Sequence, residues 1–231
     1  MELLEYKHLF KNYGEKEVLK DINIKIPRGK IIGLLGKNGS GKTTLIKLAN
    51  DLLTPTKGEV LINGKHPGID SKKVISYLPE RTYLDKSMTI KQVIKYFEEF
   101  YEDFDSNKAE KLLKDLNLDI NQKLNQMSKG MQEKVQLILV MSRKAQLYIL
   151  DEPLGGVDPA TREYILNTIL SNFNDGASVM ISTHLIADIE KILDEVIFID
   201  KGEVKLISPA DELRNKEKSS IDEIFRRCFK C

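Results

Sequence analysis

Hydrophobic and polar residues alternate in different ways along the first part of the chain, and the pattern predicts several strands and one helix. Ile22–Ile26 alternates apolar and polar residues, which is typical of a half-buried strand. Lys30–Leu35 is an almost continuous apolar run, which is typical of a strand buried on both faces. A helix is expected over Lys42–Leu53, closed by Thr54-Pro55. Further strands are expected over Leu3–Phe10, Glu59–Asn63 and Val74–Leu78.

From Thr89 onward the pattern becomes helical. Thr89 and Asn107 are good N-cap candidates because their side-chain oxygens can accept from a free amide of the first turn. The charged segments expected to form helices are Thr89–Tyr101, Asn107–Leu116 and Gly130–Arg143. Such a helical stretch predicts a subdomain inserted into a sheet.

The last part of the chain alternates apolar strands with helical segments, which predicts a parallel α/β sheet. These strands are expected over Gln146–Leu150, Ala177–Ser182 and Glu195–Ile199. A hairpin strand over Glu203–Ile207 and a charged tail of one or two short helices over Pro209–Cys231 are expected to follow.

Composition limits the class of protein. The chain has 231 residues, of which 41% are hydrophobic, so it can bury the core of a single domain. Its 36 Lys and Arg residues nearly balance 35 Asp and Glu residues, which excludes binding of nucleic acid by bulk charge alone. Cys228 and Cys231 are the only cysteines, so a disulfide-stapled secreted fold is excluded. The N-terminal residues lack the pattern of a signal peptide, and no apolar run is long enough to span a bilayer. We therefore expect a cytoplasmic protein.

A glycine-rich segment follows the buried strand directly and matches the phosphate-binding pattern G-x-x-x-x-G-K-[ST]. Its glycines allow a tight loop whose backbone amides can surround phosphate oxygens at the start of a helix. Lys42 would reach the β- and γ-phosphates, and the Thr43 hydroxyl would hold Mg²⁺. The expected nucleotide-binding residues are Gly36, Lys37, Asn38, Gly39, Ser40, Gly41, Lys42, Thr43 and Thr44.

A second chemical feature is the pair of carboxylates that ends the apolar strand before Pro153. Asp151 and Glu152 are neighbours in sequence, and successive strand residues point to opposite sides, so the two carboxylates are expected to have different tasks. We assign Asp151 to Mg²⁺ and Glu152 to the water that attacks the γ-phosphate. Together with the phosphate loop, the pair indicates a P-loop nucleoside triphosphatase.

Further segments indicate which kind of P-loop nucleoside triphosphatase this is. Met127–Gln132 lies before the acidic strand, Gly155–Pro159 follows it, and the next apolar strand ends at His184. In this order and spacing, the chain resembles the nucleotide-binding subunit of ATP-binding-cassette (ABC) transporters from Tyr13 to about Ile207. The resemblance implies an α/β fold with a P-loop core that is RecA-like and contains a mixed, largely parallel sheet. It also implies an antiparallel N-terminal β subdomain and a helical subdomain at about 84–143 within a single domain over 1–231, followed by a short helical tail at 209–231.

The resemblance also implies roles for single residues. Tyr13 would stack on adenine, although it can also be read as an ordinary strand-edge tyrosine. His184 would contact the γ-phosphate and join Glu152 and Lys42 in catalysis. In this family two subunits sandwich two ATP molecules, and the signature segment completes the site of the opposite subunit. The residues carried over to that segment are Ser128, Lys129 and Gly130, and Asp158 would lie on the loop that crosses the dimer interface.

The sequence departs from the family pattern at several positions. The signature usually reads Leu-Ser-Gly-Gly-Gln, whereas Met127, Lys129 and Met131 stand at its first, third and fifth positions here. Glu80 stands where the family commonly has a glutamine, so a carboxylate is expected near Mg²⁺. Lys37 replaces a more usual proline in the phosphate loop. The first two departures resemble the short cassettes of bacterial drug and antibiotic exporters.

The expected function is ATP binding and hydrolysis that drive transport, with export favoured, through a separate transmembrane permease. ATP and Mg²⁺ are the expected cofactors, and a homodimer or pseudo-symmetric heterodimer of cassettes is expected at the cytoplasmic face of the membrane. No nucleic acid partner is expected. A soluble single-cassette ATPase acting in cluster assembly or another non-transport process remains an alternative. A nucleotide-regulated binding module is disfavoured because the catalytic residue types are present.

Overall fold

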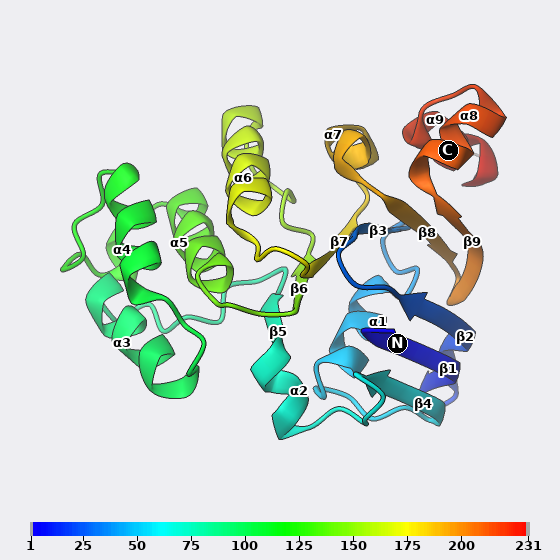
Figure 1. Cartoon of the computed structure of the whole chain (residues 1–231), viewed down its shortest axis with the longest axis horizontal. Helices are drawn as coiled ribbons and strands as arrows, with labels where there is room; N and C mark the ends of the chain where they lie inside the picture. The colour runs from blue at the N-terminus through cyan, green and yellow to red at the C-terminus, as the bar shows by residue number, and fades with distance from the viewer. Residues whose placement is uncertain (1, 230–231) are drawn as a thin grey trace.

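A six-stranded sheet lies at the centre of the computed structural model, which describes residues 2–229 (Figure 1). Its strand order is β5-β6-β7-β3-β8-β9, and β9 alone pairs antiparallel with its neighbour. The strands are β5 (Ile75–Leu78), β6 (Leu147–Asp151), β7 (Ser178–Thr183), β3 (Ile31–Leu35), β8 (Glu195–Asp200) and β9 (Glu203–Pro209). The predicted parallel sheet and its final hairpin are confirmed. The carboxyl ends of β3, β6 and β7 meet at one edge, which is where parallel α/β sheets bind ligands.

A smaller antiparallel sheet packs over one face of the central sheet, with α1 (Lys42–Ala49) between the two (Figure 1). Its order is β2 (Lys16–Ile26), β1 (Leu4–Tyr13) and β4 (Lys57–Ile62). Ile24 of the small sheet, Leu45 of α1 and Ile32 of β3 belong to one buried cluster. This shared core fixes the start of α1 against both sheets, and it confirms the antiparallel N-terminal sheet.

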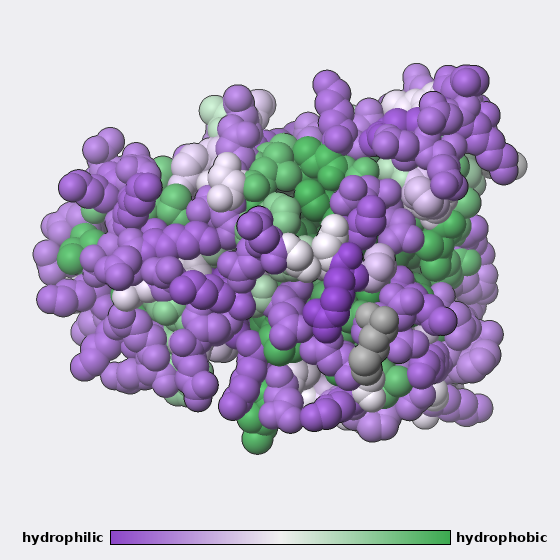
Figure 2. Space-filling view, in the orientation of Figure 1, coloured by the Kyte–Doolittle hydropathy of each residue, from purple (hydrophilic) through white to green (hydrophobic). Residues whose placement is uncertain are grey.

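Helices cover the opposite face of the central sheet. They are α6 (Pro159–Asn172), α7 (Ile186–Ile189), α8 (Ala210–Glu217) and α9 (Ile221–Phe229), together with the short helix η2 (Glu190–Ile192). Figure 2 shows a hydrophobic area between α6 and α7 on a face that is otherwise largely hydrophilic. In α9, Phe225 and Phe229 pack around Phe198 of β8, with ring centroids 5.3 and 5.9 Å from the Phe198 ring. The C-terminal helices are thereby attached to the sheet that carries the phosphate loop.

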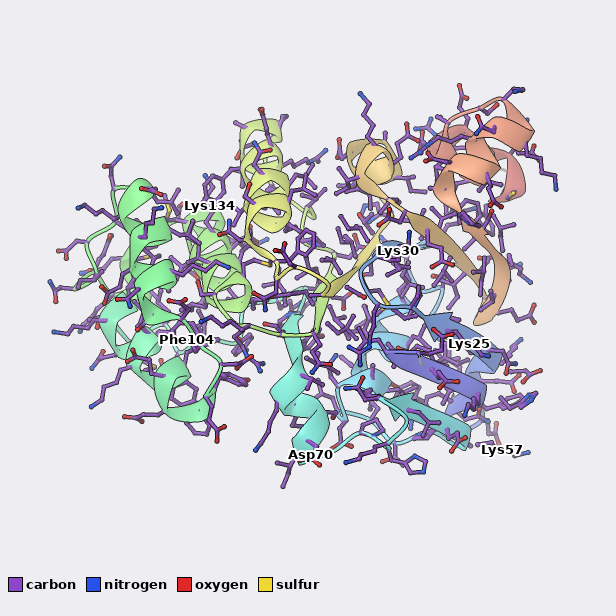
Figure 3. All side chains as sticks on the ribbon, in the orientation of Figure 1. Lys25, Lys30, Lys57, Asp70, Phe104 and Lys134 are labelled. Atoms are coloured by element: carbon purple, nitrogen blue, oxygen red, sulfur yellow. The ribbon has the colours of Figure 1, made fainter. Side chains whose placement is uncertain are left out.

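A separate helical region, defined here as α3 to α5, extends from the far end of the central sheet (Figure 1). It contains α3 (Ile90–Phe100), α4 (Ser106–Asp115), η1 (Leu124–Gln126) and α5 (Lys129–Met141). Its apolar residues form their own buried cluster, in which the rings of Phe97 and Phe104 lie 5.4 Å apart (Figure 3). Lys134 of α5 places its Nζ atom 4.8 Å from the ring centroid of Tyr164 on α6 (Figure 3). The region therefore has its own core but also contacts the main body.

Arg143 joins the helical region to the central sheet. This side chain is only 3% exposed, and its Nη1 atom donates to the Ile75 carbonyl oxygen at 2.6 Å. Its Nε atom donates to Asp103 Oδ1 at 3.0 Å, and its guanidinium lies 3.8 Å from the Tyr101 ring centroid. A buried, paired arginine of this kind ties α5 to β5.

Several helix boundaries differ from the sequence predictions. The first helix ends at Ala49 rather than at Leu53, because Asp51 adopts a φ of 57°. Thr89 caps α3 as predicted, whereas Asn107 is not a cap: Asp105 begins α4 by accepting from the Lys108 amide. The short helix α2 (Ile69–Val74) was not predicted, since it is too short to show a helical period.

The tail forms two short helices as predicted, within the described residues. Cys228 is exposed and unpaired, and Cys231 lies outside the described residues. Over residues 2–229 no helix has the length and apolar character needed to cross a bilayer.

Candidate nucleotide site

The phosphate loop joins the end of β3 to the start of α1. A Cβ atom on Gly36 would lie 2.4 Å from the carbonyl oxygen of Ile199, so only glycine fits there. Gly41 caps α1 with a φ of 112°, a left-handed conformation that side chains disfavour. These two constraints bring the first amides of α1 to the edge of the sheet, where they can bind an anion.

Lys42 extends back across its own loop. Its Nζ atom donates to the Gly36 carbonyl oxygen at 2.7 Å and to the Lys37 carbonyl oxygen at 3.3 Å. The same atom lies 3.2 Å from Glu152 Oε1, and the lysine side chain is only 5% exposed. The ammonium group is thus held at the mouth of the loop, next to a carboxylate.

Asp151 ends β6 and is almost completely buried. Ser182 donates to its Oδ1 atom at 2.5 Å, whereas Oδ2 is buried without a hydrogen-bond partner. Burial raises the pKa of this carboxyl group, and the hydrogen bond from Ser182 and the nearby Thr43 hydroxyl oppose that shift. The negative charges of Glu152 and Glu80 raise the pKa further. A cation among these oxygens would favour the ionised form.

Glu152 leaves the strand in a different direction from Asp151. Its φ of 50° is rare for a non-glycine residue, and its amide donates to the Ser182 carbonyl oxygen at 3.0 Å. Its Oε2 atom lies 2.9 Å from Nδ1 of His184, and its Oε1 atom is the one near Lys42. The structure therefore separates the two carboxylates, as the strand geometry predicts, and places Glu152 between an imidazole and an ammonium group.

These groups border a cleft of about 1560 Å³ at the carboxyl edge of the sheet. Tyr13, at the end of β1, lines it with a ring that is 48% exposed and has the Lys11 ammonium 5.3 Å from its centroid. The predicted residues that line the cleft are Tyr13, Asn38, Gly39, Gly41, Lys42, Thr43, Thr44, Glu80, Lys129, Glu152 and His184. The structure thus gathers residues from both sheets and from the helical region around one volume.

Other predicted residues lie elsewhere. Ser128 caps α5, and its hydroxyl accepts from the Met131 amide at 3.3 Å. Asp158 caps α6 by accepting from the Thr161 amide and hydroxyl, and these bonds lower the pKa of Asp158. Neither residue is among the described lining residues of the cleft, nor is Gly130. Gly36, Lys37, Ser40 and Asp151 also lie outside that lining; they support the loop or the strand end from within.

Sequence reasoning missed the basic side chains that line the cleft beyond the motifs. They are Lys16, Lys20, Arg81, Lys86 and Lys201. No motif marks them, because they come from separate strands and loops that only the fold brings together. Lys37 has an unforeseen contact as well: its Nζ atom donates to the Phe229 carbonyl oxygen at 2.9 Å, at the end of α9. The last turn of the tail therefore touches the phosphate loop.

Comparison with known proteins decides the family. A family model described as "ABC transporter" matches residues 19–155. The chain belongs to the ABC transporter family. The ABC-type transporter ATP-binding protein EcsA of Bacillus subtilis is 30% identical over 97% of this chain and 96% of its own length. The SkfA peptide export ATP-binding protein SkfE of the same organism is 32% identical over 88% of each chain.

A solved structure described as the ATP binding subunit of an ABC transporter is also similar to this ABC chain. The two superpose with a TM-score of 0.87 at 29% identity, over 97% of this chain and 98% of the other. Family membership and fold together confirm the predicted resemblance, the α/β cassette fold, and the function as an ATP-binding and ATP-hydrolysing subunit of this transporter family.

Proposed function

We propose that this chain hydrolyses ATP with Glu152 as the base and drives export through a separate transmembrane permease. The observation that carries the proposal is the position of Glu152 between Lys42 and His184, at 3.2 and 2.9 Å. A carboxylate held there can accept a proton from an attacking water. The two neighbouring groups can stabilise the negative charge that develops on the γ-phosphate.

Nucleotide binding follows from the same geometry. The amides at the start of α1 accept the phosphates, and the exposed ring of Tyr13 offers a stacking surface for adenine. Phosphate oxygens in the loop compete with Glu152 for the Lys42 ammonium group. The binding of ATP thereby releases Glu152 to act on water.

The residues near Asp151 fit Mg²⁺. Asp151 Oδ2 is buried without a partner, the Thr43 hydroxyl interacts with Asp151, and the Glu80 charge is close enough to raise its pKa. Oxygen donors of this kind suit Mg²⁺, which takes its remaining ligands from phosphate and water. Among residues 2–229, no group of three or more His, Cys, Asp or Glu side chains is arranged to hold a metal by itself. The bound ion would supply positive charge to the phosphates.

The signature segment supports a dimer that shares its sites. Ser128 and Lys129 are exposed at the start of α5, and Asp158 is exposed at the start of α6. In a head-to-tail pair, Ser128 and Gly130 of one subunit would reach the γ-phosphate held by the other. Closing the pair excludes bulk water and strengthens the electrostatic interactions around Glu152.

The surface next to Glu80 supports docking of a permease. Tyr83, Tyr96 and Phe100 are 52, 47 and 64% exposed, and the last two rings stack with centroids 4.4 Å apart. Phe97 is buried in the core of the helical region. Leu84 and Met88 are partly buried and pack against that core. The aromatic and apolar residues of this surface are thus divided between the internal core of the helical region and an exposed apolar patch. The relative SkfE, named for peptide export, supports export as the direction.

The test is co-purification. A tagged Glu152→Gln chain is expressed in its native cell, membranes are solubilised in mild detergent with ATP, and bound proteins are identified. We expect a multi-span membrane protein in a fixed ratio, at the cytoplasmic face of the membrane. Recovery in the soluble fraction alone, or with a soluble assembly, would contradict transport and favour the soluble ATPase.

A further inference from the structure

A small second cavity lies beside the nucleotide cleft. It has a volume of about 30 Å³, which exceeds the roughly 10–15 Å³ that one buried water needs. Glu80, Glu133 and Glu152 line both spaces, so the small cavity adjoins the cleft. Its other walls include Asp151 at the end of β6 and Gln136 of α5.

Two oxygen atoms beside this cavity have no hydrogen-bond donor. Gln136 is only 3% exposed, and its Oε1 atom is buried without a hydrogen-bond partner. Asp151 Oδ2 is also buried without a hydrogen bond, whereas Glu152 Oε1 is buried with the Lys42 ammonium group 3.2 Å away. Leaving a buried polar atom unpaired destabilises a fold, so two such acceptors beside one cavity indicate a ligand that donates hydrogen bonds or carries positive charge.

Gln136 belongs to the helix that begins with the signature segment. It lies on the same side of α5 as Lys129 and Glu133, whose side chains are 3.5 Å apart at the border of the cleft. No motif marks Gln136, and the contacts described above give its Oε1 atom no structural task. Its position links the helix that faces a second subunit with the carboxylates of the chain's own site.

We propose that this cavity holds one ordered water that donates to Gln136 Oε1 and to Glu152 Oε1, so that Gln136 positions the catalytic carboxylate. Asp151 Oδ2 is left for the Mg²⁺ site assigned above. A neutral amide oxygen and a carboxylate oxygen are suitable acceptors for the two hydrogens of a water. Movement of α5 when a second subunit binds would then be transmitted to Glu152. This inference rests on the proposed function of Glu152 and adds a positioning residue to it.

The variant that tests the role is Gln136→Met, which keeps the length of the side chain and removes the strong acceptor. We expect kcat for ATP hydrolysis to fall about tenfold, as is common when a supporting hydrogen bond to a site residue is lost, and KM for ATP to change less than about twofold. Gln136→Glu, which restores acceptor oxygens, is expected to recover part of kcat. The matched control is Leu137→Met, an apolar lining residue of the same cavity, which is expected to leave kcat unchanged.

A double-mutant cycle separates positioning from simple packing. If Gln136 acts through Glu152, then Gln136→Met should cause no further loss of single-turnover rate in the Glu152→Gln background. An additive loss, or a Gln136→Met rate equal to that of Leu137→Met, would overturn the proposal.

The water itself is tested by a high-resolution crystal structure of the whole chain. We expect one density peak within hydrogen-bond distance of Gln136 Oε1, which disappears in Gln136→Met. An empty cavity would overturn the proposal, as would anomalous density after a rubidium soak, because that would identify a monovalent cation instead. The proposed function would fail by a different result, namely if the unmodified chain does not hydrolyse ATP or recruits no permease. In that case the density in the cavity would still decide whether the water is present.

Discussion

The phosphate-loop side of the cleft and the signature segment differ in the contacts that their polar side chains make within one chain. On the phosphate-loop side, Glu152 is in contact with both Lys42 and His184, and Asp151 is bonded to Ser182. At the signature segment, the Ser128 hydroxyl accepts a local bond from its own helix, and the Lys129 side chain is 80% exposed. The first set is organised by the sheet, whereas the second presents groups to solvent.

This difference has a physical origin. The carboxyl ends of parallel strands converge, so residues distant in sequence meet there without any further partner. The signature segment begins a helix in a region with its own core, and its exposed side chains have only local partners, such as Glu133 at 3.5 Å from Lys129. A site built from both parts is therefore expected to require a second subunit.

The largest effect is expected from removing the phosphate-loop ammonium group. Lys42→Ala should lower kcat/KM for ATP by about 1000-fold, because in the proposed mechanism the same group binds the phosphates and stabilises the transition state. Steady-state phosphate release measures the rate, and a fluorescent ATP analogue measures binding. A Lys42→Ala chain that retains wild-type turnover would show that Lys42 has no role in ATP binding or hydrolysis.

The next largest effect should separate binding from chemistry. Glu152→Gln is expected to lower kcat by about 100-fold or more while ATP binding persists, because the amide cannot take a proton from water. The variant should also accumulate as an ATP-bound dimer in size-exclusion chromatography. A Glu152→Gln chain that turns over at the wild-type rate would show that another group is the base.

A mixing experiment tests whether the two sides come from different subunits. Ser128→Ala and Lys42→Ala are each expected to be strongly impaired alone, yet an equal mixture should regain about a quarter of wild-type activity, because half of the dimers contain one intact composite site. The control mixture is Lys42→Ala with Glu152→Gln. Both changes lie on the same side of the site, so no recovery is expected. Absence of recovery in the first mixture would argue against shared sites in a homodimer.

The smallest effect concerns the tail. Lys37→Ala removes the hydrogen bond to the Phe229 carbonyl oxygen, and the loss of about 1 kcal/mol should raise KM for ATP a few-fold through a looser phosphate loop. Removing residues 229–231 takes away the same carbonyl oxygen together with the Phe229 ring, so it should raise KM at least as much, and Lys37→Ala should add nothing further to it. Lys25→Ala, on the exposed side of β2, is the control (Figure 3). Fully additive changes in KM would show that Lys37 and the tail act independently.

Part of the site was predictable because it depends on short segments. The phosphate-loop glycines, Lys42 and the acidic strand end are contiguous in sequence, and each lies next to a strand whose apolar pattern is plain. The positive φ of Glu152 was not predictable, because nothing in the local sequence requires it; contacts with Ser182 on the neighbouring strand hold it. The Asn107 cap prediction was wrong because Asp105 is an equally good cap two residues earlier.

The sequence by itself determined the family, most of the order of strands and helices, and the residue types proposed to hold phosphate, since these depend on local motifs and hydrophobic period. Only the tertiary structure decided which groups meet: Lys42 and His184 on either side of Glu152, Lys37 against the end of α9, and Gln136 at a cavity beside the carboxylates. The reason is that these contacts join residues from different elements. The distances between these residues depend on how sheets and helices pack, and local sequence patterns do not predict that packing.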